Sequence, residues 1–211
     1  MKPTLIVIAG PNGAGKTTVT ERLRVDRWSE GVEYINPDEI ARDRFGDWNE
    51  RGAVLDAARW SEARREELLT ARAGIAFETV FSTTDKLEFV RRARLAGYFV
   101  RVFFVGTDSP IINAGRVAQR VMKGGHTVPI EKIVSRFAKS LANLPHVIPL
   151  ADRVYVFDNS RDDDDARLCA RCVDGMVRKI YGPLPAWVDE ALVGLPRHGA
   201  FEDLRSRPTP R

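Results

Sequence analysis

The chain has 211 residues, of which 44% are hydrophobic and 29% are charged, a composition typical of a globular protein that buries one core. Its 33 basic and 29 acidic residues leave a formal net charge of +4 and form no long block of one sign. This balance favours anionic ligands only weakly. Basic residues are not interleaved with aromatic residues that could stack on bases, and the sequence contains no recognisable nucleic-acid-binding module. Both observations argue against a nucleic-acid partner.

The first apolar run, residues 5–9, is too short for the core of a signal peptide or for a membrane span, and Gly10, Pro11 and Asn12 end it. We therefore expect a cytoplasmic protein without a membrane partner. One domain is expected over residues 1–196. Residues 197–211 contain four arginines, two prolines and little apolar periodicity, which predicts a flexible tail.

Short segments rich in Ile, Val, Phe or Tyr alternate with helical patterns along the chain. The predicted strands are residues 4–9, 33–36, 75–79, 99–105 and 153–157. The predicted helices are residues 17–24, 53–71, 86–96, 109–122 and 130–144. This alternation predicts an α/β fold, a parallel sheet of about five strands with helices on both faces. Ligands of such sheets bind beyond the carboxyl ends of the strands, so the residues that follow each strand form the candidate site.

The segment after the first strand is a complete phosphate-binding loop, G-x-x-x-x-G-K-T, from Gly10 to Thr17. Its glycines allow a tight turn whose backbone N–H groups surround phosphate oxygens, while Lys16 reaches the β- and γ-phosphates. Thr17 offers its hydroxyl to Mg²⁺, and the helix that begins here directs its positive dipole end at the same anion. The residues predicted to bind the nucleotide are Gly10, Pro11, Asn12, Gly13, Ala14, Gly15, Lys16, Thr17 and Thr18.

Two other classes of P-loop protein are disfavoured. A GTPase normally carries an Asn-Lys-x-Asp segment that reads guanine, and the sequence has none. A motor ATPase is usually larger and shows an apolar strand that ends in Asp or Asp-Glu, which is not evident here. The sequence therefore predicts a compact kinase of the nucleoside- or shikimate-kinase type, with ATP and Mg²⁺ as cofactors.

Several motifs together resemble the zeta-toxin family of P-loop kinases, in particular its short single-domain branch, over roughly residues 4–160. They are residues 10–18, Ile35-Asn36-Pro37-Asp38-Glu39, Phe77-Glu78-Thr79, residues 116–121, Gly124-Gly125-His126-Thr127-Val128-Pro129 and residues 151–160. The Gly-Gly-His-x-Val-Pro segment with its preceding arginines is the most discriminating. The resemblance implies phosphoryl transfer from ATP to a hydroxyl of a nucleotide sugar such as UDP-N-acetylglucosamine. It also implies a separate antitoxin protein as a partner of those members that are toxins.

Asp38 follows the second strand and matches the carboxylate with which the family accepts the proton of the acceptor hydroxyl. The same segment is a good helix start, with Asn36 as the cap, Pro37 in the first turn and acids near the helix dipole. Both interpretations can hold, because Asn36 and Glu39 suffice for the cap. We therefore predict a catalytic role for Asp38.

Glu78 and Thr79 end the third strand, on the edge of the sheet where ligands bind. Glu78 could hold Mg²⁺ through water or contact the acceptor, with Thr79 beside it. The alternative is an acid that merely ends a strand. Glu62, in the preceding helix, lies near the place where the family has an acid that contacts the acceptor, but we favour a solvated surface acid there.

Arg116 and Arg120 are four residues apart on one helical face and are followed by the Gly124-Gly125 pair. This pattern predicts a small helical lid over about residues 116–136, whose arginines neutralise charge on the transferred phosphoryl group. The alternative is a solvated basic face.

Two further residues in the lid region are candidates for the site. The family's toxins carry an arginine where His126 aligns, so His126 is predicted to contact the acceptor instead. Arg136 is a third candidate cation for the transferred phosphate.

The region after the fifth strand has three features of weaker meaning. Residues 158–160 lie where related kinases have the loop that borders adenine, so they are candidates to contact the nucleotide base. A helix-capping role for Asn159 or Ser160 agrees equally well with the sequence. The four acids at 162–165 are interpreted as the start of a helix, where negative charge favours the dipole. Cys169 and Cys172 are predicted to share one face of that helix as reduced thiols, because a single Cys-x-x-Cys pair argues only weakly for zinc.

Two other functions are compatible with these motifs. A kinase of an antibiotic hydroxyl, a dinucleotide or a nucleic-acid end would use the same loop and the same base. A nucleotide-dependent binding module would use ATP to control association with a partner, and it would not need Asp38.

Overall fold

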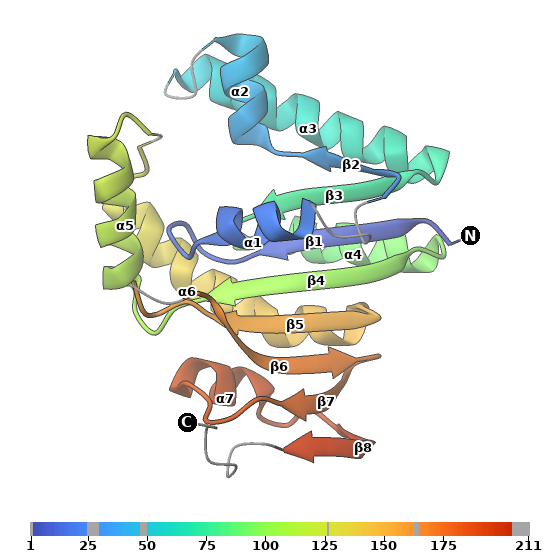
Figure 1. Ribbon diagram of the computed structural model, residues 1–211. Helices are drawn as coiled ribbons and strands as arrows, with labels where there is room; N and C mark the ends of the chain where they lie inside the picture. The colour runs from blue at the N-terminus through green and yellow to red at the C-terminus, as the bar shows by residue number, and fades with distance from the viewer. Residues whose placement is uncertain (1, 25–29, 47–49, 126, 163–164, 204–211) are drawn as a thin grey trace.

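A computed structural model of the chain describes residues 2–24, 30–46, 50–125, 127–162 and 165–203. These residues contain a sheet of eight strands in the order β2-β3-β1-β4-β5-β6-β7-β8 (Figure 1). The strands are β1 (Thr4–Ala9), β2 (Val32–Ile35), β3 (Gly74–Thr79), β4 (Phe99–Gly106), β5 (Arg153–Asp158), β6 (Arg167–Val173), β7 (Met176–Ile180) and β8 (Arg197–Asp203). The helices are α1 (Lys16–Arg24), α2 (Pro37–Phe45), α3 (Arg51–Ala71), α4 (Thr84–Leu95), α5 (Pro110–Met122), α6 (Ile130–Val147), the 3₁₀ helix η2 (Ile148–Leu150) and α7 (Ala186–Leu192). Within the described ranges, no helix is both long and apolar enough to cross a membrane.

The five predicted strands form the parallel part of the sheet, in the order β2-β3-β1-β4-β5. β1 lies between β3 and β4 and is buried on both faces, with Leu5 and Val7 on one side and Ile6 and Ile8 on the other. Burial on both faces explains why β1 is a continuous apolar run without polar alternation. The predicted α/β fold is confirmed.

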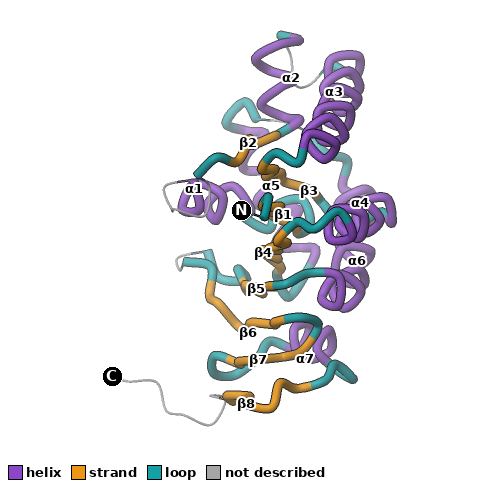
Figure 2. The backbone as a smooth tube through the Cα atoms, turned by 90° about the vertical axis from the view of Figure 1, so that its right-hand side faces the viewer, coloured by secondary structure: helices purple, strands orange, loops and turns teal. Residues whose placement is uncertain are grey.

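Helices cover both faces of the sheet, as the sequence predicts. α3, α4, α6 and α7 lie on one face and α1 lies on the other (Figure 2). The larger apolar cluster joins Val7 to Phe89 of α4, Leu144 of α6 and Val188 of α7. The smaller cluster joins Ile8 and neighbouring strand residues to α1. The two clusters hold the parallel strands in a fixed register, and this register positions the loops at the strand ends.

The carboxyl ends of the parallel strands meet at one edge of the sheet, next to α5 (Figure 1). The residues that directly follow these strands are Gly10, Asn36, Val80, Thr107 and Asn159. Segments that are far apart in sequence therefore converge at the edge where α/β proteins bind ligands.

The sheet is larger than the predicted five strands, because β6 and β7 add to β5 in antiparallel fashion and β8 adds to β7 in parallel. Cys169 and Cys172 lie in β6, so the predicted helix is wrong. Val156 pairs with Ala170 and Phe157 with Leu168, which leaves Cys169 as an extra residue in β6. This bulge disturbs the alternation and lets both cysteines face the core, a pattern that resembles helical spacing in sequence.

Burial raises the pKa of the Cys169 thiol to about 11 and that of Cys172 to about 12. Both thiols therefore stay protonated at neutral pH and are poor nucleophiles.

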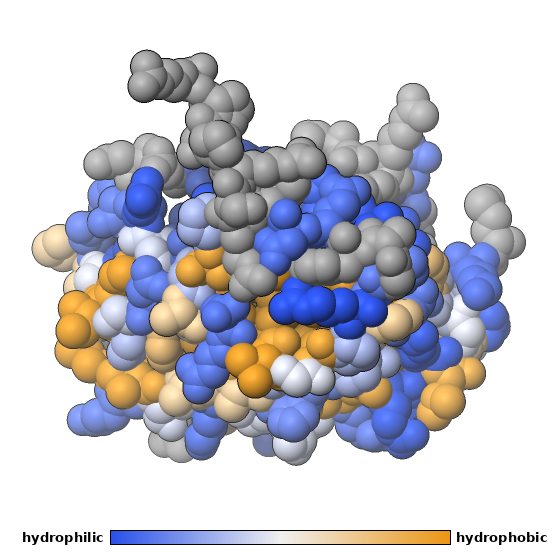
Figure 3. All heavy atoms as spheres, turned by 90° about the horizontal axis from the view of Figure 1, so that it is seen from below, coloured by the Kyte–Doolittle hydropathy of each residue, from blue (hydrophilic) through white to orange (hydrophobic). Residues whose placement is uncertain are grey.

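Two other predictions for the carboxyl-terminal third are corrected. The acids at 162–165 precede a strand and not a helix, although residues 163 and 164 lie outside the described residues. Residues 197–203 form β8, so the predicted flexible tail is wrong for them, and residues 204–211 lie outside the described residues. Figure 3 shows the molecule from below Figure 1, the side of β8, where hydrophilic and hydrophobic residues are interspersed.

Candidate active site

The phosphate-binding loop joins β1 to α1. Gly10, Gly13 and Gly15 have φ angles of 145°, 76° and 87°, which glycine adopts far more readily than other residues. Gly10 also lies against β4, since a Cβ atom there would be 2.0 Å from the carbonyl oxygen of Val105. α1 begins at Lys16, so its first N–H groups and the positive end of its dipole point into the loop. This geometry fits a phosphate.

Two asparagines hold the loop from outside. Asn113 of α5 is fully buried, hydrogen-bonds with Thr107 and donates from Nδ2 to the Asn12 carbonyl at 2.5 Å. Asn159 donates from Nδ2 to the Ala14 carbonyl at 2.8 Å. Sequence reasoning missed Asn113. The sequence did contain a signal for it: Asn113 lies four residues before Val117, so a polar amide falls on the apolar face of the predicted helix.

Lys16 lies inside the loop, where its Nζ donates to the carbonyl oxygens of Gly10 and Pro11, both at 2.9 Å. Burial lowers the pKa of Lys16 from its ordinary value, and the carboxylates of Glu78 and Asp38 partly oppose this shift. A bound phosphate would offer the ammonium group a stronger acceptor than two neutral carbonyls.

This lowered pKa predicts an alkaline limit to phosphate binding. Only the protonated lysine attracts phosphate, so affinity for a triphosphate should fall as pH rises through the Lys16 pKa, below the 10.5 of an ordinary lysine. Bound phosphate favours the charged form, so binding in this range should take up a proton. Titrations of ATP between about pH 7.5 and the ordinary lysine value of 10.5, with circular dichroism to monitor folding, measure the effect. Affinity that stays constant up to pH 10.5 would contradict the assignment.

Glu78 lies beside the loop, between α1 and β2. Its Oε1 accepts hydrogen bonds from Thr20 Oγ1 at 2.6 Å and from the Tyr34 hydroxyl at 2.8 Å. Burial raises the pKa of Tyr34, and the Glu78 charge adds to the shift, so the phenol remains a donor. Sequence reasoning missed Thr20 and Tyr34. The spacing of Thr20 four residues after Lys16 was a usable signal, because it places both on one side of α1.

Asp38 lies in the first turn of α2. The Oδ1 of Asn36 accepts a hydrogen bond from the Asp38 backbone N–H at 3.0 Å, and Pro37 is the first helical residue, so both act in the cap as predicted. The Asp38 side chain is exposed. Its negative charge, like that of Glu78, raises the pKa of Lys16. Both predicted carboxylates therefore raise the pKa of the lysine in the loop and partly oppose the effect of its burial.

The two arginines of α5 have different surroundings. Arg116 donates from Nη1 to the Asn159 carbonyl at 2.7 Å and from Nε to Asp162 Oδ1 at 2.8 Å. Arg120 is exposed, and its charge contributes to lowering the pKa of Lys16 after the larger effect of burial. The charge of Arg120 therefore affects the pKa of the phosphate-binding lysine, whereas Arg116 is hydrogen-bonded to the loop after β5.

The remaining predicted residues differ in burial and in their contacts. Thr79 is half-buried, and its Oγ1 accepts a backbone hydrogen bond within the turn after β3. Glu62 is exposed on α3, and its charge acts on Arg65. Arg136 is half-buried on α6. His126 lies outside the described residues.

A comparison with protein families decides the classification. The model of the Zeta toxin family matches residues 1–167. The chain belongs to the Zeta toxin family. The resemblance predicted from the motifs is confirmed. A related uncharacterized protein of Haemophilus influenzae is 26% identical over 137 residues, which are 65% of this chain and 94% of that protein.

Solved structures share the fold of this Zeta toxin family chain. A chain from the PezAT chromosomal toxin-antitoxin system of Streptococcus pneumoniae superposes with a TM-score of 0.57 at 14% identity, covering 78% of this chain and 70% of that one. The AvrRxo1-ORF1:-ORF2 complex with ATP gives 0.63 at 18% identity, covering 83% of this chain and 60% of that one. At these identities the similarity establishes the P-loop kinase fold.

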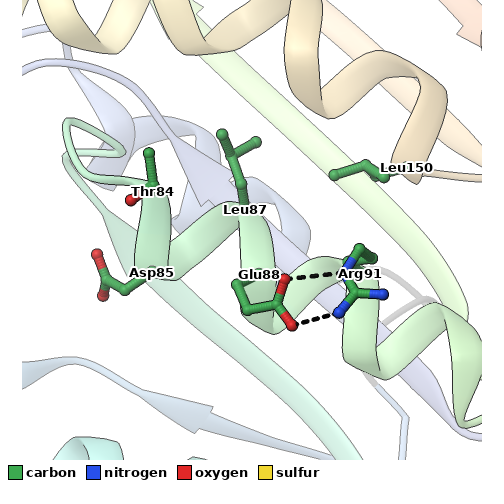
Figure 4. A pocket seen from close by; sticks show the side chains of 6 residues that line it. All are labelled: Thr84, Asp85, Leu87, Glu88, Arg91 and Leu150. Atoms are coloured by element: carbon green, nitrogen blue, oxygen red, sulfur yellow. Dashed lines mark hydrogen bonds and ion pairs between the residues drawn. The ribbon is translucent and has the colours of Figure 1, made fainter.

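The Zeta toxin match ends at Arg167, the first residue of β6, so every candidate residue named above lies within it. A hollow of about 470 Å³ lies elsewhere, over α4, lined by Thr84, Asp85, Leu87, Glu88, Arg91 and Leu150. Figure 4 shows Glu88 bonded to Arg91 there. None of its lining residues belongs to the phosphate-binding loop or to the carboxylates beside it, so we do not assign the chemistry to this hollow.

Proposed function

We propose that this chain transfers the γ-phosphoryl group of ATP to a hydroxyl of a small molecule, with a nucleotide sugar as the acceptor class. The observation that carries the proposal is the convergence of two carboxylates and a second cation on one lysine. Lys16 lies inside the glycine-rich loop, and hydrogen bonds from Thr20 and Tyr34 hold Glu78 beside it. The charges of Asp38, Glu78 and Arg120 all contribute to the pKa of Lys16. A site that only binds phosphate has no need of two acids, whereas phosphoryl transfer needs a base and a means to hold Mg²⁺.

The donor half of the site fits MgATP. The glycine turn and the start of α1 offer N–H groups to the phosphates, and Thr17 is exposed at that helix start, where its hydroxyl can face Mg²⁺. Glu78 uses Oε1 for its two hydrogen bonds, which leaves Oε2 for the water shell of Mg²⁺. Mg²⁺ typically takes one or two protein oxygens, phosphate oxygens and water, so these residues suffice. The ATP in the AvrRxo1 complex, which shares the fold, supports this choice of donor.

In the proposed reaction Asp38 accepts the proton of the acceptor hydroxyl as its oxygen bonds to the γ-phosphorus. The bond from that phosphorus to the bridging oxygen breaks, and ADP leaves. Lys16 and Arg120 neutralise the negative charge that spreads over the transferred group. Thr17 and Glu78 would hold Mg²⁺, which would supply further neutralisation of the phosphate charge.

The acceptor class rests on family membership. Zeta-toxin kinases act on nucleotide sugars, of which UDP-N-acetylglucosamine is the best-known, and Thr79, Glu62 and His126 remain candidates to contact the acceptor. A separate antitoxin protein is a proposed partner, and the toxin-antitoxin origin of the PezAT structure supports it. Kinases of other hydroxyls would share the same donor half, so the acceptor must be measured.

The experiment is incubation of the protein with γ-labelled ATP, Mg²⁺ and a panel of nucleotide sugars, nucleosides and dinucleotides. We expect label on one acceptor class, no transfer without Mg²⁺ and none with the Lys16→Met variant. Slow ATP hydrolysis with transfer to no acceptor would overturn the kinase proposal. ATP-dependent association with a protein partner, unchanged in Asp38→Asn, would favour the binding-module alternative.

A further inference from the structure

The guanidinium of Arg116 is held by residues 158–162, which we call the base-side loop. Nη1 donates to the Asn159 carbonyl at 2.7 Å, Nη2 to the Arg161 carbonyl at 3.2 Å and Nε to Asp162 Oδ1 at 2.8 Å. The Arg116 side chain is 19% exposed, whereas that of Asp162 is 74% exposed. The planar fork of N–H groups is thus fixed in direction by acceptors from three residues of one loop.

The base-side loop is also tied to the phosphate-binding loop and to the end of β4. Asn159 donates from Nδ2 to the Ala14 carbonyl at 2.8 Å and from its backbone N–H to the Gly106 carbonyl at 2.8 Å. Ser160 Oγ accepts a hydrogen bond from the Asp108 backbone N–H at 2.9 Å. This loop therefore borders the phosphate-binding loop, next to any nucleotide whose phosphates occupy it.

We propose that Arg116 is a positioning residue that sets the base-side loop for the base of the nucleotide, and that it does not bind the transferred phosphoryl group. The inference rests on the proposed function, because it takes the phosphate-binding loop as the donor site. Arg116 and Arg120, one helical turn apart on α5, then serve opposite ends of one ligand: Arg120 acts at the phosphates and Arg116 at the base.

The contacts of Arg116 make a phosphate role costly. Its N–H groups are engaged by two carbonyls and a carboxylate, so a phosphate would compete with these acceptors. Charge-assisted hydrogen bonds of this kind are among the stronger ones in proteins. Remaining in place has a benefit for binding. A loop that is already ordered loses less conformational entropy when a ligand binds against it, so affinity for the base rises.

Equilibrium titrations with MgATP and with magnesium tripolyphosphate separate the two ends of the ligand, because tripolyphosphate has no base or ribose. Arg116→Gln should weaken ATP binding about tenfold and tripolyphosphate binding less than about twofold. Asp162→Asn alters an exposed carboxylate that cannot attract phosphate, and it should weaken ATP binding about threefold with the same selectivity. Arg91→Gln, which breaks a similar ion pair with Glu88 on α4, is the matched control and should bind both ligands as the wild type does.

Equal weakening of both ligands by Arg116→Gln, with Asp162→Asn unchanged, would make Arg116 a phosphate ligand and overturn the inference. Unchanged ATP binding in both variants, or a wild type that binds tripolyphosphate as tightly as ATP, would overturn it too. Thermal unfolding reports on folding, and the exposed Asp162 variant keeps the test valid if Arg116→Gln does not fold. The titrations need no acceptor, so they test this inference independently of phosphoryl transfer. A wild type that binds ATP but phosphorylates no acceptor would overturn the kinase proposal, and the titrations would still decide the role of Arg116.

Discussion

Asp38→Asn is expected to lower phosphoryl transfer by at least about 100-fold, while ATP affinity stays within about twofold of the wild type. Asparagine has the shape of aspartate but cannot accept the acceptor proton at neutral pH. The cap of α2 uses the Asn36 side chain and the backbone N–H of residue 38, so the substitution leaves it intact. Initial rates with labelled ATP and equilibrium ATP titrations measure the two quantities.

A matched control exists on the same helix. Asp43 is an exposed acid of α2 that pairs with Arg42, so Asp43→Asn makes the same chemical change away from Lys16. We expect wild-type rates in that variant. Near-normal turnover in Asp38→Asn would remove Asp38 from the mechanism, whereas equal losses in both variants would mean that α2 as a whole, and not the carboxylate, matters.

Gly10→Ala is expected to destabilise the fold by at least about 3 kcal/mol and to abolish nucleotide binding. The added Cβ atom would lie 2.0 Å from the Val105 carbonyl oxygen, and the φ of 145° is itself strained for alanine. β1 and β4 are paired at this level, so neither backbone can move without disturbing the sheet. Thermal unfolding should show a decrease of roughly 6–12 °C for a chain of this size.

Gly115→Ala is the control for this substitution. Gly115 lies in α5, and a Cβ atom there would meet no atom within 4 Å. Because alanine favours the helix over glycine, we expect a gain of about 0.5–1 kcal/mol. A Gly10→Ala variant with wild-type stability and ATP affinity would show that the backbone at residue 10 is less constrained than these contacts indicate.

The parallel half of the fold could be predicted because its signals are local. An apolar strand, a glycine-rich turn and a helix follow one another within residues 4–24, and the alternation of strands and helices continues to residue 158. Asp38 and Glu78 could be proposed as site residues because parallel strands bring their carboxyl ends to one edge. Lys16 lies close to the same edge, because the phosphate-binding loop follows β1.

The missed features depend on contacts between distant residues. Three-residue spacing of Cys169 and Cys172 indicates a helix unless the bulge against β5 is known, and that bulge is a property of two strands. Arg116 and Arg120 are equivalent in the helical pattern. They differ only because Asp162 and Asn159, more than forty residues later, hold the first of them. No local pattern could separate their roles.

The side chains that brace the phosphate-binding loop determine when, during synthesis, the nucleotide site is complete. The loop starts at residue 10, yet β1 is enclosed only when β3 and β4 flank it, and the braces come from Asn113 and Asn159. Contacts across such long sequence separations must first overcome the entropy of loop closure, which slows folding. During synthesis a nascent chain shorter than 159 residues has the complete motif but lacks Asn159, one of its two braces. The ribosome must therefore synthesise Asn159 before both braces of the nucleotide site are present.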